Sequence, residues 1–382
     1  MKKYFVLLLP MLLALSASAQ VFTPAYLRIS LDDSTKNHLL EKLDTLIAQA
    51  KRGQRPAALV SVKDSAFSMD MFASLQTIGD NTTDSIPGFY KPSLINVYAV
   101  SPTEYLLSLA FAGIKDGRPV IKAVMQMLAT IDSGNITFAT PLTYYTRNWH
   151  TKQVGNVTYH YVDRINLKTA ALFNEKNTRM AQKLQLPVDT LDFYLCDNYQ
   201  EILPLLGFSY SQSSNGRTRD GYGVVSGKIF SVMHSEDFSH DLLHEYVYMI
   251  RTNTRNRPAE EGLAYTWGNA YYTDAQGESI SQHTLVMALK AYLAAHPGAS
   301  LLELFNKDPK IFDALAKEVS VKTTIASVIC DDIEKQKGVE GIKALVNCGA
   351  GDDNYFAVID KLTGVNKTNF NDRVGALLQA YK

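Results

Sequence analysis

The apolar side chains of this chain follow one pattern in its first half and another in its second half, and this change restricts the fold more than any other feature. Between about residues 94 and 160, short apolar runs are separated by turn-like residues, a pattern typical of β-strands. From residue 278 to the C-terminus, apolar residues recur at the spacing of helices. A strand-rich first half followed by a helix-rich second half predicts an α+β fold.

Individual elements follow from the same patterns. We expect strands at four places that together form an antiparallel sheet, and they are INVYAV (95–100), YLLSLAFAG (105–113), NITFATPLTYYTRNW (135–149) and NVTYHYV (156–162). We expect helices at TKNHLLEKLDTLIAQA (35–50), PVIKAVMQMLATI (119–131) and NLKTAALFNEKNTRMAQKLQL (166–186). Residues 68–92 look irregular, and LDFYLC (191–196) and GKIFSVM (227–233) look like buried strands. The predicted organisation is an N-terminal antiparallel α+β domain at 20–165 and a mostly helical domain at 166–382.

The first residues, MKKYFVLLLPMLLALSASAQ, have the three parts of a secretory signal peptide. Lys2 and Lys3 form a basic start, residues 4–15 are apolar, and Ala-Ser-Ala precedes Gln20. We therefore predict a signal peptide at residues 1–19 and an exported protein, periplasmic or secreted. The apolar run is shorter than the roughly 20 residues of a membrane helix, and no later segment is apolar enough to span a bilayer.

The balance of positive and negative charges restricts the classes of molecule that this protein binds. Lys and Arg total 38 and Asp and Glu total 38, so the formal net charge is zero. This balance argues against nucleic acid or an anionic membrane surface as the main partner. A peptide or protein ligand stays open.

The segment HDLLHEYVY (240–248) contains histidines at the spacing of a metal site. On a helix, two ligands four residues apart lie on the same face and can bind one zinc ion. A carboxylate next to the first histidine can then accept a proton from a water molecule on the metal. A third ligand must come from elsewhere in the chain, which leaves one position for water or substrate.

Just downstream, PAEEGLAYTWGNA (258–270) offers such a ligand. Together, HEYVY and RNRPAEEGLAYTWGNA resemble the His-Glu-x-x-His and Glu-Gly-x-Ala pair of peptidase MA-like gluzincins, as found in exported proteins of Bacteroidetes-type bacteria. The resemblance covers roughly residues 190–382 and implies a gluzincin-like metallopeptidase domain with zinc as cofactor. In this frame, His244 is the first ligand, Glu245 is the general base and Glu261 is the third ligand.

Tyr248 stands where this frame requires the second histidine. A neutral phenol with a pKa near ~10 is a poor substitute for imidazole, so this frame predicts a degraded metal site. A shifted frame uses His240 and His244 as ligands and Asp241 as the base, with Glu261 again the third ligand. Aspartate is one methylene shorter than glutamate, and a displacement of about 1 Å can cost ~100-fold in rate.

Three functions remain open at this point. The first is a gluzincin-like exported protein with a degenerate motif and weak or no peptidase activity. The second is an active zinc-dependent peptidase that uses the shifted site of His240, His244 and Glu261. The third is a non-catalytic binding protein of the cell envelope.

Two further groups of residues have a functional and a plain structural interpretation. Tyr265, Trp267 and Tyr271 either line an aromatic cleft near Glu261 or pack in the core. The three cysteines are too few for a disulfide scaffold. Cys330 and Cys348 either form a disulfide in an oxidising compartment or are, like Cys196, buried thiols.

Overall fold

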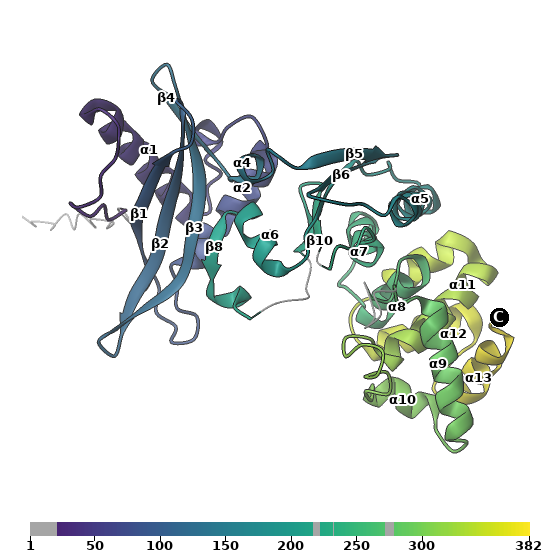
Figure 1. The fold of residues 1–382 in the computed structure, drawn as a ribbon. Coiled ribbons are helices and arrows are strands. Elements are labelled where there is room, and N and C mark those ends of the chain that lie inside the picture. The colour runs from purple at the N-terminus through teal and green to yellow at the C-terminus, as the bar shows by residue number, and fades with distance from the viewer. Residues whose placement is uncertain (1–20, 217–221, 232, 272–278) are drawn as a thin grey trace, which may run out of the picture. The chain divides into compact units, whose positions relative to one another are not determined.

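The chain folds into two units, each with its own sheet (Figure 1). The computed structural model describes the chain except for residues 1–20, 217–221, 232 and 272–278. The predicted signal peptide at residues 1–19 lies outside the described residues. The first unit contains the chain up to Tyr145 together with Leu203–Gly216, and the second contains Thr146–Ile202 and the rest of the chain to Lys382.

The first unit is built on an antiparallel sheet. Its strands, in spatial order, are β1 (Lys91–Ala99), β2 (Glu104–Lys115), β3 (Arg118–Asp132) and β4 (Asn135–Ala139), and β8 (Phe208–Ser211) pairs with β3. Helix α1 (Asp33–Lys51) buries Leu39, Leu43, Leu46 and Ile47, which recur at helical spacing. These side chains share one core with the buried side chains of the sheet. The smaller helices of this part are α2 (Ser65–Ala73), α3 (Leu75–Ile78) and α4 (Leu142–Tyr145), with a 3₁₀ turn at Ala57–Leu59.

Three predictions for this unit were wrong. The strand expected at 135–149 ends at Ala139, and Leu142–Tyr145 form the helix α4. Residues 119–131, predicted as a helix, belong to the long strand β3. Ala123, Met125, Met127 and Ala129 are buried at every second position, and β3 pairs with strands on both sides, so the period is that of a strand. Residues 68–92, predicted as irregular, contain most of α2 and all of α3.

The second unit contains a mixed sheet. Its strands, in spatial order, are β5 (His150–Val154), β6 (Val157–Tyr161), β7 (Leu191–Leu195), β10 (Lys228–Ser231) and β9 (Tyr222–Val225). Strand β7 is parallel to both of its neighbours, while the outer pairs are antiparallel hairpins. The predicted domain boundary at 165/166 therefore differs from the division at 145/146, because the hairpin of β5 and β6 hydrogen-bonds to β7.

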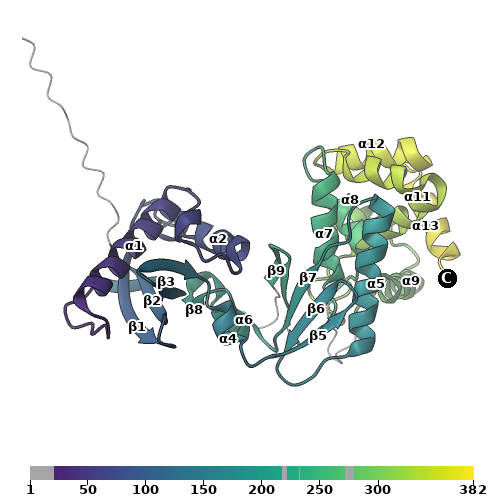
Figure 2. The same cartoon turned by 90° about the horizontal axis from the view of Figure 1, so that it is seen from above.

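Helices α5 (Leu167–Leu184) and α7 (Ser239–Ile250) pack beside this sheet (Figure 2). The remaining helices are α8 (Arg257–Trp267), α9 (Gln282–Ala295), α10 (Leu301–Lys307), α11 (Val321–Val346), α12 (Asp352–Thr363) and α13 (Phe370–Ala380). Helix α6 (Tyr199–Leu205) spans the point where the chain passes between the units. The mixed α+β class predicted from the sequence is confirmed.

Close packing of α8 against α11 explains why glycine follows Glu261. A Cβ atom at Gly262 would lie 2.9 Å from the backbone carbon of Ala326, which is closer than side chains pack. The cysteines Cys196, Cys330 and Cys348 are free thiols, so Cys330 and Cys348 do not form a disulfide. Within the described part of the chain, the helices are too short or too polar to cross a bilayer.

Candidate metal centre

Helices α7 and α8 supply the three predicted ligands. Helix α7 buries Leu242, Leu243, Tyr246 and Val247, and this leaves His240 and His244 half-buried on a neighbouring face. Helix α8 begins after Asn256, whose side chain accepts a hydrogen bond from the amide of Ala259 and caps the helix. The same side chain donates to the carbonyl oxygens of Gly349 and Gly351 at 2.7 and 2.9 Å, which fixes the start of α8 against the segment before α12.

The three ligand atoms converge on one point. The Nε2 atoms of His240 and His244 lie 3.2 Å apart, and Oε2 of Glu261 lies 3.3 Å from the first and 3.9 Å from the second. A point equally far from all three atoms lies about 2.0 Å from each, which is the length of a zinc–nitrogen or zinc–oxygen bond. The described residues therefore contain a His-His-Glu cluster that could hold a metal ion.

Each imidazole is oriented by its other nitrogen. Nδ1 of His240 lies 2.9 Å from the carbonyl oxygen of Asn269, and Nδ1 of His244 lies 2.7 Å from Oε1 of Glu260. Both partners are acceptors, so both Nδ1 atoms carry the hydrogen and donate. The Nε2 lone pairs of both rings are then free to face the common point, which is how histidines that bind metals are usually held.

Glu260 anchors one side of the cluster. Only 2% of this residue is exposed, and its carboxylate accepts hydrogen bonds from three cationic or polar neighbours. Besides His244, the guanidinium of Arg251 lies at 2.9 Å and that of Arg255 at 3.0 Å. Arg255 also donates to Oε1 of Glu261 at 2.7 Å, so that Oε2 is the oxygen turned to the histidines. We did not predict Glu260 as a site residue, although its place directly before Glu261 was a usable signal.

A buried polar network supports the His240 side. Lys176 on α5 donates to Oδ2 of Asp237 at 2.8 Å, to Oδ1 of Asn269 at 2.6 Å and to Oγ of Ser239 at 3.2 Å. Asn269 in turn donates to Asp237 at 2.7 Å, while its backbone oxygen accepts from His240. All three donor hydrogens of the lysine are thus used, and the network joins α5, the start of α7 and the end of α8.

The electrostatics of the cluster favour an ionised glutamate. Burial alone opposes the charge of Glu261, but the hydrogen bond from His240 and the charges of His240, His244 and Arg255 lower its pKa to about 2. Burial likewise opposes the imidazolium of His240, yet the hydrogen bond to Glu261 and the charges of Asp241 and Glu261 raise its pKa overall. Without a metal, the two side chains therefore behave as an ion pair.

The structure distinguishes between the two predicted ligand sets, one with Tyr248 and one with His240 in the second position. Tyr248 is 68% exposed, and the guanidinium of Arg251 lies 5.4 Å from the centre of its ring. His240 occupies that place in the cluster instead. Asp241 lines a cavity of about 250 Å³ beside His240 and Glu261. Glu245 is not among the described residues lining this cavity, and burial together with the charge of Asp189 raises its pKa.

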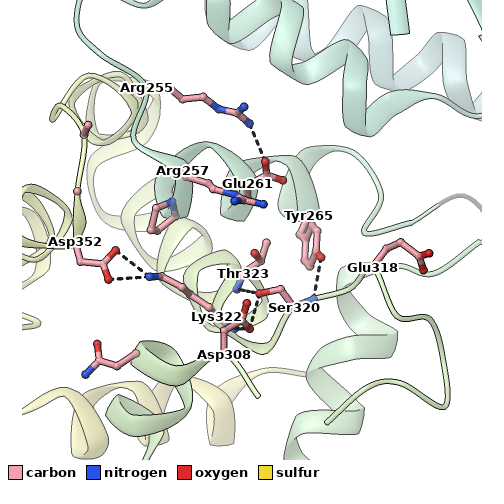
Figure 3. A pocket seen from close by; sticks show the side chains of 14 residues that line it. Arg255, Arg257, Glu261, Tyr265, Asp308, Glu318, Ser320, Lys322, Thr323 and Asp352 are labelled. Atoms are coloured by element: carbon pink, nitrogen blue, oxygen red, sulfur yellow. Dashed lines mark hydrogen bonds and ion pairs between the residues drawn. The ribbon is translucent and has the colours of Figure 1, made fainter. Parts of the chain in front are cut away.

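The cluster borders a second, larger cavity of about 550 Å³ (Figure 3). Glu261, Tyr265 and Glu318 line both cavities, so the two adjoin at these side chains. Tyr271 lines the smaller cavity. Trp267 is buried in the core and donates from Nε1 to Glu334 at 2.7 Å. Of the three predicted cleft aromatics, two therefore line the cavities and Trp267 packs in the core.

No protein-family model matches this chain, and no curated protein is significantly similar to it. We therefore infer the function from the geometry of the site.

Replacing Lys176 with methionine tests the buried network. The K176M variant leaves the carboxylate of Asp237 buried without its cation, so we expect the free energy of unfolding to fall by about 3–5 kcal/mol. Urea denaturation followed by circular dichroism measures this change. Lys168, which is exposed on the same helix, provides the control, and K168M should stay within about 0.5 kcal/mol of the wild type. Equal stability of the two variants would contradict the structural role of Lys176.

The ion pair of Glu261 with His240 makes a prediction for the metal-free protein. The lowered pKa of Glu261 gives stability that is present above about 4.5 and lost as the pH falls toward 2. The raised pKa of His240 gives stability that is present below about 6.5 and lost as the pH rises through the folded-state pKa. In EDTA, the stability difference between wild type and E261Q should therefore be largest between about pH 4.5 and 6.5 and smaller on both sides. A difference independent of pH would show that the pair is not ionised.

Proposed function

We propose that this protein binds one zinc ion through His240, His244 and Glu261 and hydrolyses peptide bonds with it. The observation that carries the proposal is the orientation of the imidazoles, because both Nδ1 atoms donate to fixed acceptors and both Nε2 atoms face Oε2 of Glu261. In the metal-free protein, a hydrogen on Nε2 of His240 can bridge this atom to Oε2 of Glu261 and to Nε2 of His244, 3.3 and 3.2 Å away. A metal ion would take the place of that hydrogen and be held by all three atoms.

The donor set favours zinc. Two imidazole nitrogens and one carboxylate oxygen are the protein ligands of a common class of catalytic zinc site, which keeps one position open. The adjoining cavity of about 250 Å³ supplies the space for that open position. When bound there, zinc would lower the pKa of a water molecule and polarise a substrate carbonyl.

The chain's own residues supply the remaining functions. Asp241 lines the cavity together with His240 and Glu261, which supports its proposed role as the base that would accept a proton from water. Arg255 holds Oε1 of Glu261, which leaves Oε2 as the oxygen that would bind the metal. Glu260 and the Asn269 carbonyl keep the two rings in the tautomer that a metal requires.

The proposed enzyme is thus a gluzincin-like peptidase whose motif is His-Asp-x-x-His followed by glutamate. This frame departs from the His-Glu-x-x-His resemblance at Asp241, and it replaces the interpretation of Tyr248 as a lost ligand. Export by an N-terminal signal remains part of the proposal. Of the alternatives, a non-catalytic binding protein becomes the better description if zinc binds and no hydrolysis follows.

Metal content is the first test of this function. Wild-type protein, dialysed against trace zinc and measured by elemental analysis, should contain close to one zinc ion per chain. The variants H240A, H244A and E261A each remove a ligand and should lose affinity by more than the roughly 10–100-fold that loss of a supporting partner costs. The variant H296A is the matched control, since His296 is an exposed histidine at the end of α9. The variant Y248F should also keep its zinc. Loss of zinc in Y248F with retention in H240A would contradict the proposed frame.

The general base is tested by two carboxylate variants. With zinc bound, D241N should lower kcat for a mixture of unstructured peptides by about 10²–10⁴-fold, because water then lacks its proton acceptor. E245Q should change kcat little, since Glu245 is not among the residues lining the cavity. D241E restores the longer side chain of related sites and should keep or raise kcat. Zinc content is measured on every variant, and a large effect of E245Q with none of D241N would overturn the assignment.

A further inference from the structure

We propose that the larger cavity binds the carboxylate-bearing end of a substrate peptide and that Arg257 is the group that recognises this carboxylate. The catalytic meaning of this inference rests on the proposed function of the metal site. The binding step itself involves residues outside the ligand cluster, so it can be tested without metal.

One face of α8 carries both the proposed metal ligand Glu261 and the proposed carboxylate-binding residue Arg257. Arg257, Glu261 and Tyr265 are spaced four residues apart, which places them on the same side of the helix, and all three line the larger cavity (Figure 3). One helical turn advances about 5.4 Å, so Arg257 begins one turn before the proposed metal ligand. An extended peptide covers about 3.3–3.6 Å per residue. If the cleaved peptide bond lies at the metal, a carboxylate held by Arg257 therefore belongs to the first or second residue after that bond.

Most charged side chains of this cavity have a partner, and for Asp308 these partners are neutral donors. Arg255 is paired with Glu260 and Glu261. Lys322 contacts both carboxylate oxygens of Asp352, at 2.9 and 2.8 Å. Asp308 accepts from the Ser320 hydroxyl at 2.7 Å and from the Lys322 amide at 3.0 Å.

Two charged side chains remain. Among the residues that the structure describes, neither Arg257 nor Glu318 forms a hydrogen bond or an ion pair, and both line the larger cavity. A guanidinium presents paired N–H groups in one plane, which match the two oxygens of a carboxylate. Arg257 is exposed at this cavity, next to the proposed metal site, and is thus accessible to a substrate anion.

The position of Glu318 makes the charge differ between the two ends of the adjoining cavities. Glu318 lines the smaller cavity as well as the larger one, whereas Arg257 lines only the larger. A peptide carboxylate is repelled by Glu318 and by Asp308 and attracted by Arg257, so its stable position is beside Arg257. The substrate class that fits is a short peptide with either a free C-terminal carboxylate or an acidic residue just after the cleaved bond.

The test is a binding measurement on the full chain in EDTA at about 0.15 M salt, where exposed charges are screened beyond about 8 Å. The probes are N-acetyl-Ala-Ala-Ala with a free carboxylate, the same peptide as its C-terminal amide, and N-acetyl-Ala-Asp-Ala-amide. Isothermal titration or ligand-detected NMR gives their dissociation constants. We expect at least one carboxylate peptide to bind roughly tenfold or more tightly than the neutral amide, as a charge-assisted hydrogen bond predicts.

Variants assign the preference to Arg257. R257Q should remove the difference between the charged and neutral peptides. R179Q, which changes an exposed arginine on α5 of the same unit, should keep it. Preference for the free C-terminus alone identifies an enzyme acting at peptide ends, while equal preference for the aspartate peptide identifies recognition of acidic side chains.

The inference is overturned if all three peptides bind equally, if none binds at millimolar concentration, or if the preference survives in R257Q. Zinc content, measured on EDTA-free portions of the same protein preparations after dialysis against trace zinc, keeps the two proposals apart. A carboxylate preference that depends on Arg257 in a protein that takes up no zinc would leave this cavity as a carboxylate site and remove the peptidase function. A protein that takes up zinc and shows no such preference would keep the proposed metal site and remove the carboxylate site.

Discussion

The site depends first on the hydrogen bond from His240 to the carbonyl oxygen of Asn269, because this contact joins the first turn of α7 to the end of α8. The two segments approach so closely that a Cβ atom at Gly268 would lie 2.8 Å from the carbonyl oxygen of Ser239. Only glycine fits at that contact without a shift of the backbone. With the helices in this arrangement, the two histidines and Glu261 need little adjustment to contact one common metal ion.

The second requirement is charge compensation in a partly buried region. Glu260 is almost fully buried, and an unpaired carboxylate there would cost several kcal/mol. Arg251 and Arg255 supply two positive charges, and the second of them also contacts Glu261. One arginine therefore fixes the relative position of the carboxylate that orients His244 and the carboxylate proposed to bind metal. Lys176 plays a comparable part beneath His240, through Asp237 and Asn269.

The ligands could be predicted from the sequence because they lie on two helices close together in the chain, where spacing alone places side chains on a face. The sequence could not decide whether Tyr248 or His240 is the partner of His244, since each is four residues from it. Only the fold shows which of the two lies next to Glu261. Lys176 was beyond prediction, because it is about 60 residues from Asp237 and nothing local marks it. The strand at 118–132 was misread as a helix because its apolar residues also match helical spacing, and its sheet partners are distant in sequence.

In the proposed function, the identity of residue 241 matters for catalysis and not for metal binding. The ligand geometry is set by His240, His244, Glu261 and their supporting partners, none of which depends on the length of the neighbouring acid. The base, in contrast, must reach a water molecule from a fixed helix position, and an aspartate ends about one C–C bond earlier than a glutamate. Because proton transfer falls steeply with distance, a well-formed zinc site and a slow reaction are compatible in one protein. In the proposed peptidase, substrates that position the attacked carbonyl closer to Asp241 would be favoured, so the charged cavity next to the site would influence the rate.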